Sequence, residues 1–144
     1  MSDPTRPAAD ELLRANRDFY RAFASGDYVA MDRLWSEQAD STCVHPGWEI
    51  IRGRERVMAS WRGVLRRPLP VRSRDELVTV LGEVGVVVCV EVLPEGELAA
   101  SNVFVLEQGR WRMLHHQAGL IARSLRDEDS DDEPDDSDEG RLLN

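Results

Sequence analysis

The sequence contains no lysine, and all 18 of its basic residues are arginine. We interpret this bias as a result of genomic base composition, which favours a bacterial source. Most of the chain also has a net charge of zero. Residues 127–144 hold 10 acids and one arginine, which accounts for the whole formal charge of −9. Because residues 1–126 are neutral overall, they offer no basic field, and we expect no nucleic-acid partner.

Cysteine and histidine are scarce. The two cysteines, Cys43 and Cys89, have no CxxC spacing, which indicates reduced thiols in a core rather than a disulfide. The three histidines follow no HExxH or Cys/His ligand pattern, so we expect no metal site. No glycine-rich phosphate loop is present, and we expect no cofactor.

Long hydrophobic runs are absent. No apolar stretch reaches 18 residues, and the N-terminal segment MSDPTRPAADELL lacks the charged and then apolar pattern of a signal peptide. We therefore expect a cytoplasmic protein with no membrane partner.

The length and composition fit one domain. With 144 residues, 42% of them hydrophobic, the chain can bury a core without disulfides or metal. We expect a flexible N-terminus at residues 1–9, a domain at 10–126 and an acidic tail at 127–144. Ten acids occupy the thirteen positions 127–139, so this tail cannot offset the entropy of ordering and should be disordered. It either increases solubility or attracts a basic partner.

Three helices are predicted in the first half. Apolar and aromatic positions recur at helical spacing in residues 7–25, again after the capping residue Asp27, and from about residue 54 to 65. Gly26 ends the first helix, and Pro68 and Pro70 follow the third. The inner-face residues are Leu12, Phe19, Tyr20 and Phe23 in the first helix; Tyr28, Met31, Leu34 and Trp35 in the second; and Val57, Trp61, Val64 and Leu65 in the third.

The rest of the chain is predicted to form β-strands. A brief strand at 39–45 precedes the third helix, and four longer strands at 71–81, 84–93, 97–107 and 110–118 are joined by short turn segments. Short links favour an antiparallel meander. The sequence therefore predicts an α+β protein that is cone-shaped, with three N-terminal helices packed on a curved antiparallel sheet.

The order of these features resembles the SnoaL-like branch of the nuclear transport factor 2-like superfamily. Three segments within about residues 10–123 carry the resemblance: FYRAFASGDYVAMDRLWSEQA, HPGWEIIRGRERVMASW and GRWRMLHHQ. The resemblance implies a conical fold, an internal pocket open at one end and homodimerisation through the sheet. The fold hosts isomerases, dehydratases, epoxide hydrolases, cyclases and noncatalytic association modules, so it does not choose a reaction.

Ketosteroid isomerase, a member of this superfamily, suggests where a site would lie. It uses an Asp as base, and a Tyr with a protonated Asp to stabilise the oxyanion. Its Asp-Pro-x-Gly turn is similar to the HPG turn of this chain, and this similarity places His45 at the position of the catalytic base. The same comparison places Phe19 at the position of the Tyr and Asn102 at the position of the second Asp. Phe19 cannot donate a hydrogen bond, although Tyr20 is adjacent, so the steroid isomerase set is not matched.

His45 is the central candidate. Pro46 disfavours a helical conformation for the residue before it, so His45 should lie extended at a strand end before the Pro46-Gly47 turn. An imidazole with an ordinary pKa of about 6.5 can give or take a proton near neutrality. His45 either faces a pocket as a general acid or base, with Asn102 as a polarising donor, or only hydrogen-bonds in the turn.

The remaining candidates would line the pocket. His115 and His116 are neighbours on a strand, so their side chains point to opposite faces and cannot converge on one ion. The family comparison places Leu114 and His116 on the pocket side, and Trp48 at its mouth. The expected ligand-binding residues are Phe19, Tyr20, Trp48, Trp61, Phe104, Leu114 and His116.

Two functions follow. The first is a lyase, isomerase or hydrolase that binds a small, largely apolar organic ligand and uses His45 and Asn102. The second is a noncatalytic binding or association module in which the same residues fill the cone. A carboxylate beside His45 would favour the enzyme. The homodimer expected from the resemblance is supported by the strand at 84–93, which is apolar on both faces and so needs cover on both.

Overall fold

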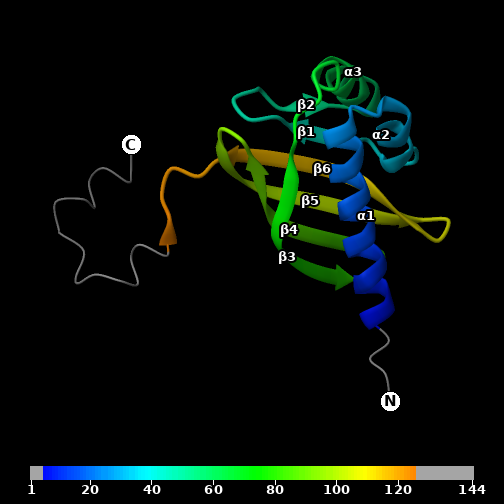
Figure 1. Ribbon diagram of the computed structural model, residues 1–144. Helices are drawn as coiled ribbons and strands as arrows, with labels where there is room; N and C mark the ends of the chain where they lie inside the picture. Colours follow the sequence, from blue (N-terminus) through cyan, green and yellow to red (C-terminus); the bar gives the residue numbers. More distant parts are fainter. Residues whose placement is uncertain (1–4, 126–144) are drawn as a thin grey trace.

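The computed structural model describes residues 5–125 as three helices on one face of a six-stranded sheet (Figure 1). The helices are α1 (Thr5–Ser25), α2 (Tyr28–Leu34) and α3 (Arg54–Val64). The strands are β1 (Thr42–Val44), β2 (Ile51–Arg52), β3 (Arg72–Leu81), β4 (Val84–Leu93), β5 (Gly96–Glu107) and β6 (Arg110–Leu120). The predicted α+β architecture is confirmed. The tail predicted at 127–144 lies outside the described residues, as do residues 1–4.

The sheet order is β2-β1-β6-β5-β4-β3. β3 to β6 form the predicted antiparallel meander. The sheet as a whole is mixed, because β1 pairs with β6 in parallel and β2 adds a short antiparallel edge strand that the sequence did not indicate. The parallel pairing also determines where the HPG turn lies. It sets Cys43 of β1 opposite His116 of β6, which brings the HPG turn to the inner face of the sheet.

Helix α1 crosses the concave face of the sheet because one of its faces carries the residues that the core needs (Figure 1). Leu12, Asn16, Phe19 and Tyr20 recur at helical spacing and are all buried. The helix approaches β4 so closely that a Cβ on Gly85 would lie 2.3 Å from a methyl carbon of Leu12. A side chain at this position would force the buried Leu12 to shift, so glycine allows α1 to pack closely on the sheet.

The turn between α1 and α2 also depends on glycine. Gly26 has a φ of +67°, and a Cβ there would lie 2.9 Å from the carbonyl oxygen of Leu65. Asp27 then caps α2 by accepting a hydrogen bond from the Ala30 amide at 3.0 Å. These contacts fix the ends of α1, α2 and α3 against one another at one end of the sheet.

Large rings fill the space between the helices and the sheet. Phe19, Trp35, Trp61 and Phe104 are fully buried. The opposite face of the sheet has no cover from the described residues and carries exposed apolar side chains, which are Leu77, Leu81, Val84 and Val88. The apolar side chains of β4 that point inward therefore pack in the core. Those that point outward remain exposed.

Candidate functional site

His45 is held at the end of β1 by a tight turn. The Trp48 amide donates to the His45 carbonyl oxygen at 2.9 Å, and Gly47 adopts a φ of +83°. The imidazole is 4% exposed, and its Nε2 lies 3.0 Å from the Ser60 hydroxyl on α3. Ser60 gives its single proton to the Val57 carbonyl, so Nε2 of His45 must carry the hydrogen that it donates to Ser60. Nδ1 is left as an unprotonated acceptor.

Aromatic rings surround this imidazole. Trp48 and Trp61 approach it edge-on, with ring centroids at 4.9 and 4.8 Å, and the ring of His116 lies 6.5 Å away. Burial lowers the pKa of His45 from 6.5 to about 4, so it is neutral at neutral pH. The ordinary pKa assumed from the sequence does not hold in this environment. The atom nearest to Nδ1 that could donate to it is the Cys43 sulfur at 4.0 Å. A neutral imidazole with an unprotonated Nδ1 can accept a proton, but it does not carry the second proton that an imidazolium acid would donate.

A chain of buried polar groups continues from His116 into the centre of the cone. The Asn102 amide nitrogen donates to the Asn16 side-chain oxygen at 2.8 Å and to the Tyr20 hydroxyl at 3.1 Å. The Asn102 oxygen lies 2.6 Å from Nδ1 of His116. Because that oxygen can only accept, Nδ1 of His116 carries the hydrogen, and its bare Nε2 faces Glu91 Oε2 at 3.7 Å.

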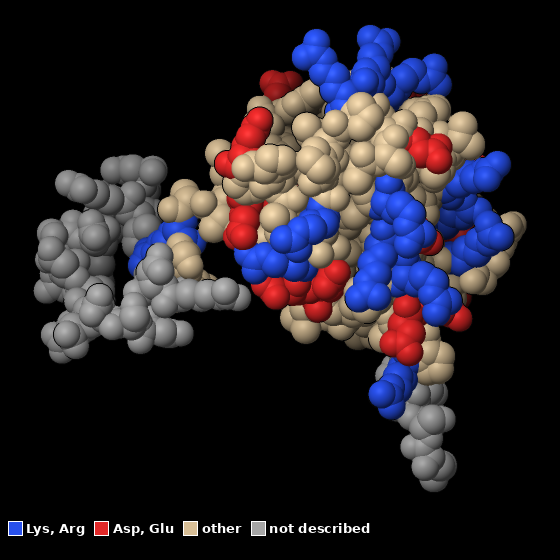
Figure 2. All heavy atoms as spheres, in the orientation of Figure 1, with Lys and Arg blue, Asp and Glu red and all other residues tan. Residues whose placement is uncertain are grey.

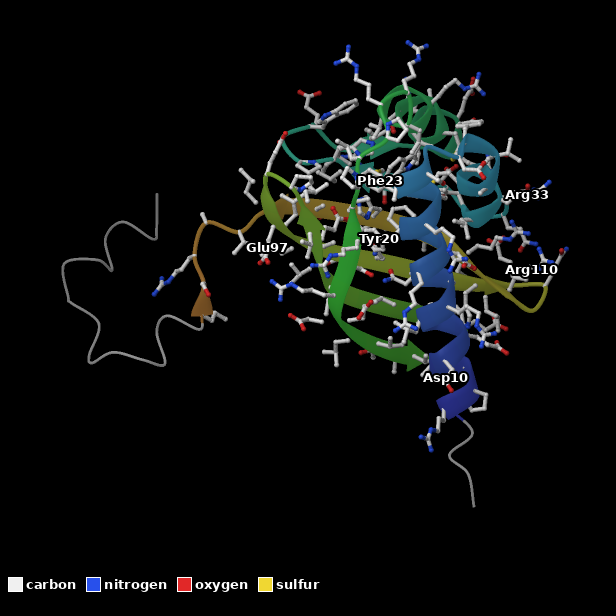
Figure 3. All side chains as sticks on the ribbon, in the orientation of Figure 1. Asp10, Tyr20, Phe23, Arg33, Glu97 and Arg110 are labelled. Atoms are coloured by element: carbon white, nitrogen blue, oxygen red, sulfur yellow. The ribbon has the colours of Figure 1, made fainter. Side chains whose placement is uncertain are left out.

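Glu91 ends this chain. Its side chain is 2% exposed, and Oε2 accepts a hydrogen bond of 2.7 Å from the Tyr20 hydroxyl. Tyr20 lies on the part of α1 that crosses the sheet, with Phe23 nearer to α3 (Figure 3). Burial raises the pKa of the Glu91 carboxyl, and the hydrogen bond from Tyr20 partly offsets the shift. The carboxyl is thereby moved toward the protonated form that can donate a proton.

The other ionisable groups are also shifted toward their neutral forms. Burial, followed by the charges of His45 and His115, lowers the pKa of His116 to about 3. Burial and the nearby Glu91 carboxylate raise the pKa of Tyr20. Burial raises the pKa of Cys43 to about 12, so this thiol is not an activated nucleophile although its sulfur lies 3.7 Å from Nε2 of His45.

The structure brings most of the predicted residues together. The ring of Phe19 lies 5.0 Å from His116 and 5.5 Å from Trp61, which joins the His45 region to the polar chain. Trp48 is 53% exposed and covers His45 from outside. Phe104 is buried deeper in the core, opposite Gly85 and Met113.

Leu114 is placed differently from the prediction. The ladder between β5 and β6 shifts register here, because Val103 pairs with His115 while Phe104 pairs with Met113. Strict alternation would put Leu114 on the same face as His116, but the irregularity buries Met113 instead and leaves Leu114 half-buried. His115 points away from His116, and its Nδ1 lies 2.6 Å from the Thr42 hydroxyl.

Sequence reasoning missed Asn16, Ser60 and Glu91. Glu91 had a detectable signal, because it is the one charged residue in the apolar segment VGVVVCVEV and it shares the inward parity of Val87 and Cys89. Asn16 also lies on the apolar stripe of its helix, between Leu12 and Phe19. A polar residue at a core position is the pattern that identifies both.

The cone interior is filled by its own side chains. Four surface pockets of about 480 to 730 Å³ lie around the described residues, and none of these four is lined by His45 or His116. Two buried donors in the cluster, the Trp61 indole nitrogen and the Asn16 amide nitrogen, have no hydrogen-bond partner. Unsatisfied buried donors are costly and accommodate an acceptor readily.

Within residues 5–125 no group of three His, Cys, Asp or Glu side chains is arranged to hold a metal ion. No helix there is both long and apolar enough to cross a membrane.

Comparison with known families agrees with this architecture. The family model of the SnoaL-like domain matches residues 12–123. The chain belongs to the SnoaL-like family. Its fold is that of the nuclear transport factor 2-like proteins, a group that includes ligand-binding proteins and isomerase-type enzymes.

Individual relatives are diverse. The chain is 26% identical over 117 residues to the F-box protein SKIP8 of Arabidopsis thaliana, a match that covers 76% of this chain and 49% of that protein. The chain therefore spans about half the length of that curated relative.

Two solved structures are similar at comparable identity. A protein of Streptomyces avermitilis, proposed to be a dehydratase of the NTF2-like family, is 25% identical with a TM-score of 0.75, covering 81% of this chain and 98% of its own. A proposed calcium/calmodulin-dependent protein kinase type II association domain of Thiobacillus denitrificans is 26% identical with a TM-score of 0.63, covering 74% and 92%.

Proposed function

We propose that this SnoaL-like protein binds a small, largely apolar organic molecule in its cone and acts on it by acid and base chemistry without a cofactor. The observation that carries the proposal is the buried cluster of His45, His116, Glu91 and Tyr20 inside an otherwise apolar core. Burying four ionisable groups is costly, and such groups with shifted pKa values concentrate at functional sites.

The role of each side chain in this proposal follows from whether its polar atoms can donate or accept a proton. Nδ1 of His45 is an unprotonated acceptor in a ring of aromatic side chains, so it serves as the base. Glu91, with its raised pKa and its link to Tyr20, serves as the acid. Both amide hydrogens of Asn102 are committed to Asn16 and Tyr20, so Asn102 orients the cluster rather than polarising the ligand directly. A base and an acid in one cluster suit an elimination or an isomerisation. The Streptomyces relative is described as a proposed dehydratase.

Access requires a side chain to move. Trp48 is the exposed ring above His45, and its turn contains Gly47 with a positive φ, so we propose that Trp48 opens the cone to the ligand. The released space would expose Nδ1 of His45 and the unpartnered indole nitrogen of Trp61.

The experiment compares His45→Asn with His115→Asn. Asparagine keeps a polar group of similar size but removes a base useful near neutrality. We expect a panel of cyclic hydroxy ketones and enones to contain a compound that the wild type converts, and His45→Asn to bind it but lose turnover by about 100-fold or more. His115 lies on the other sheet face, so His115→Asn should keep full activity. Equal turnover in both variants would refute the role of His45.

The alternative function is a noncatalytic association module. Two observations favour it: the cone interior is filled by rings such as Trp35 and Phe104, and the open sheet face is apolar. Under this alternative His45→Asn would change the affinity for ligand by only about 1 kcal/mol, the contribution of one hydrogen bond. Absence of any conversion across the panel, together with stable self-association, would favour the module.

A homodimer is part of the proposal. The uncovered face of the sheet carries Leu77, Leu81, Val84 and Val88. Contiguous exposed apolar surface of this kind marks interaction sites. A second copy of this chain, packed sheet to sheet, would cover it.

A further inference from the structure

Ser60 connects the imidazole of His45 to the backbone of α3. Its hydroxyl oxygen lies 3.0 Å from Nε2 of His45, and it donates its proton to the Val57 carbonyl oxygen at 2.6 Å. The three groups form a relay, in which the ring N–H donates to the hydroxyl and the hydroxyl donates to the carbonyl. Because the only proton of the hydroxyl is used in this way, Ser60 can act toward His45 only as an acceptor.

Helix α3 places Ser60 at the edge of its buried face. That face is formed by Val57, Met58 and Trp61. The arginines of α3 lie on the other side, and Figure 2 shows basic side chains over this helix at the top of the view. Ser60 follows Val57 by one helical turn and is half-buried, so its hydroxyl reaches the imidazole at the end of β1.

The helix itself does not favour serine at this position. Serine is a weaker helix former than alanine, because its hydroxyl competes with the backbone for hydrogen bonds. The preceding position is occupied by Ala59. The interaction that a serine adds here, and that an alanine would lack, is the hydrogen bond with His45.

Ser60 occupies the place where a carboxylate would hold a catalytic histidine. Within residues 5–125 no carboxylate is hydrogen-bonded or ion-paired to His45. The Cys43 sulfur lies 3.7 Å from Nε2, but sulfur is a weak acceptor. The edges of Trp48 and Trp61 restrain the ring, yet an aromatic contact does not distinguish its two nitrogens. The hydrogen bond to Ser60 is therefore the contact that selects Nε2 as the protonated atom.

We propose that Ser60 is the positioning residue of the base: it keeps the hydrogen of His45 on Nε2 and so leaves Nδ1 to take the proton of the ligand. This inference rests on the proposed function, because it concerns the base of the same site. In the reaction Nδ1 gains the proton, the electron pair of the broken bond stays on the ligand, and the Nε2 hydrogen stays bonded to Ser60. A charged donor makes a stronger hydrogen bond than a neutral one, so the relay stabilises the imidazolium more than the neutral ring.

The hydrogen bond is tested without any ligand. NMR of the full chain with ¹⁵N-labelled histidine follows the Nε2–H group of His45 near neutral pH, and His45→Asn assigns its signals. We expect the wild type to carry its hydrogen on Nε2, and Ser60→Ala to move the ¹H and ¹⁵N signals of this group. Ser60→Thr should keep them near the wild-type positions, because a threonine hydroxyl can also bond a carbonyl of the preceding turn.

Ser41 provides the matched control. Its hydroxyl is also fully buried but has no hydrogen-bond partner, so Ser41→Ala should leave the His45 signals unchanged. If Ser60→Ala does not fold, Ser60→Cys replaces it, because a thiol has a similar size and is a weak acceptor. A hydrogen on Nδ1 in the wild type, or equal Nε2–H signals in the wild type and Ser60→Ala, would overturn the proposal.

Turnover separates a positioning role from a structural one. With a compound that the wild type converts, Ser60→Ala should lower kcat by about tenfold or more and leave KM within about twofold, because the relay acts on the imidazolium formed during the reaction. Ser60→Thr should restore most of the loss, and Ser41→Ala should equal the wild type. A change confined to KM, or a Ser60→Thr as slow as Ser60→Ala, would overturn the role.

Failure of this inference can be told from failure of the proposed function. If His45→Asn loses turnover while Ser60→Ala keeps it, His45 remains the base and Ser60 does not position it. If the Nε2–H signals depend on Ser60 but His45→Asn and Ser60→Ala both convert the compound as the wild type does, Ser60 holds the ring and the proposed function is wrong.

Discussion

At the scale of single residues, the decisive feature is that burial shifts the pKa values of the ionisable side chains in the cone toward their neutral forms. His45 and His116 have pKa values lowered to about 4 and about 3, and Glu91 has a raised pKa, in each case mainly because of burial. Burial thus moves a carboxyl and two imidazoles of one cluster toward their uncharged forms. Two imidazolium groups with ring centroids 6.5 Å apart could not coexist cheaply.

The lowered histidine pKa values predict a loss of stability in mild acid. Below pH 6.5 the unfolded chain binds protons that the folded chain rejects, so the free energy of unfolding falls as the pH falls from about 7 toward 4. For His45 the loss is about 3 kcal/mol at most by pH 4, at about 1.4 kcal/mol per pH unit. Glu91 acts in the opposite direction, because its raised pKa favours the folded state in acid, but it opposes two histidines.

Urea denaturation at several pH values measures this slope. His45→Asn should flatten the curve between pH 6.5 and 4, because it removes one of the two buried imidazoles. A wild-type free energy of unfolding that stays constant over this range would contradict the buried neutral histidines.

At the scale of elements, the site depends on how closely α1 seats on β4. Gly85 lies beneath Leu12 of α1, and the polar chain needs Asn16 and Tyr20 from the same helix to reach Asn102 and Glu91. A helix raised from the sheet would lengthen both hydrogen bonds together. The absence of a side chain at position 85 therefore positions two residues of the buried polar chain.

Gly85→Ala should destabilise the fold by about 1 to 3 kcal/mol, because the new methyl group would lie 2.3 Å from a methyl carbon of Leu12. The variant should also perturb the NMR signal of Tyr20. Gly119→Ala on β6 is the control, since nothing lies within 4 Å of its Cβ position. Chemical denaturation reports both values, and adding Leu12→Ala should partly relieve the clash. Equal stability of the two glycine variants would mean that α1 does not press on β4.

At the scale of the whole molecule, one face of the sheet is covered by helices and the other is open. Leu77 and Val88 are opposite each other in the ladder between β3 and β4, and both are exposed. An apolar face of this size next to a filled core is typical of a subunit interface.

Val88→Glu should convert the proposed homodimer to a monomer, because it places an unpaired charge in the centre of the apolar face. Val29→Glu is the control, since Val29 is 60% exposed on α2, away from the sheet. Light scattering at micromolar concentration should report a dimer for the wild type and for Val29→Glu. A monomeric wild type would overturn the dimer, while far-UV circular dichroism confirms that each variant is folded.

The acidic tail is predicted to be dispensable for folding. Deleting residues 127–144 removes the whole net charge but, before Leu142, no apolar residue that could dock on the domain. The free energy of unfolding should change by less than about 1 kcal/mol. A large fall in melting temperature on deletion would show that the tail docks on the domain.

The sequence by itself determined the fold class and every element except the short edge strand β2, and it singled out His45 as the candidate residue. Helical spacing in α1 and α3, short links between β3 and β6, and the HPG turn at His45 are local features, and local propensity and periodicity encode them. The tertiary structure alone decided which polar groups meet. Glu91, Asn16 and Asn102 are far apart in the chain, and a register shift at Leu114 changed which side chains of β6 face inward. Pairing between distant segments depends on packing and register, which single-chain periodicity does not specify, so only the folded protein decided which groups meet Glu91.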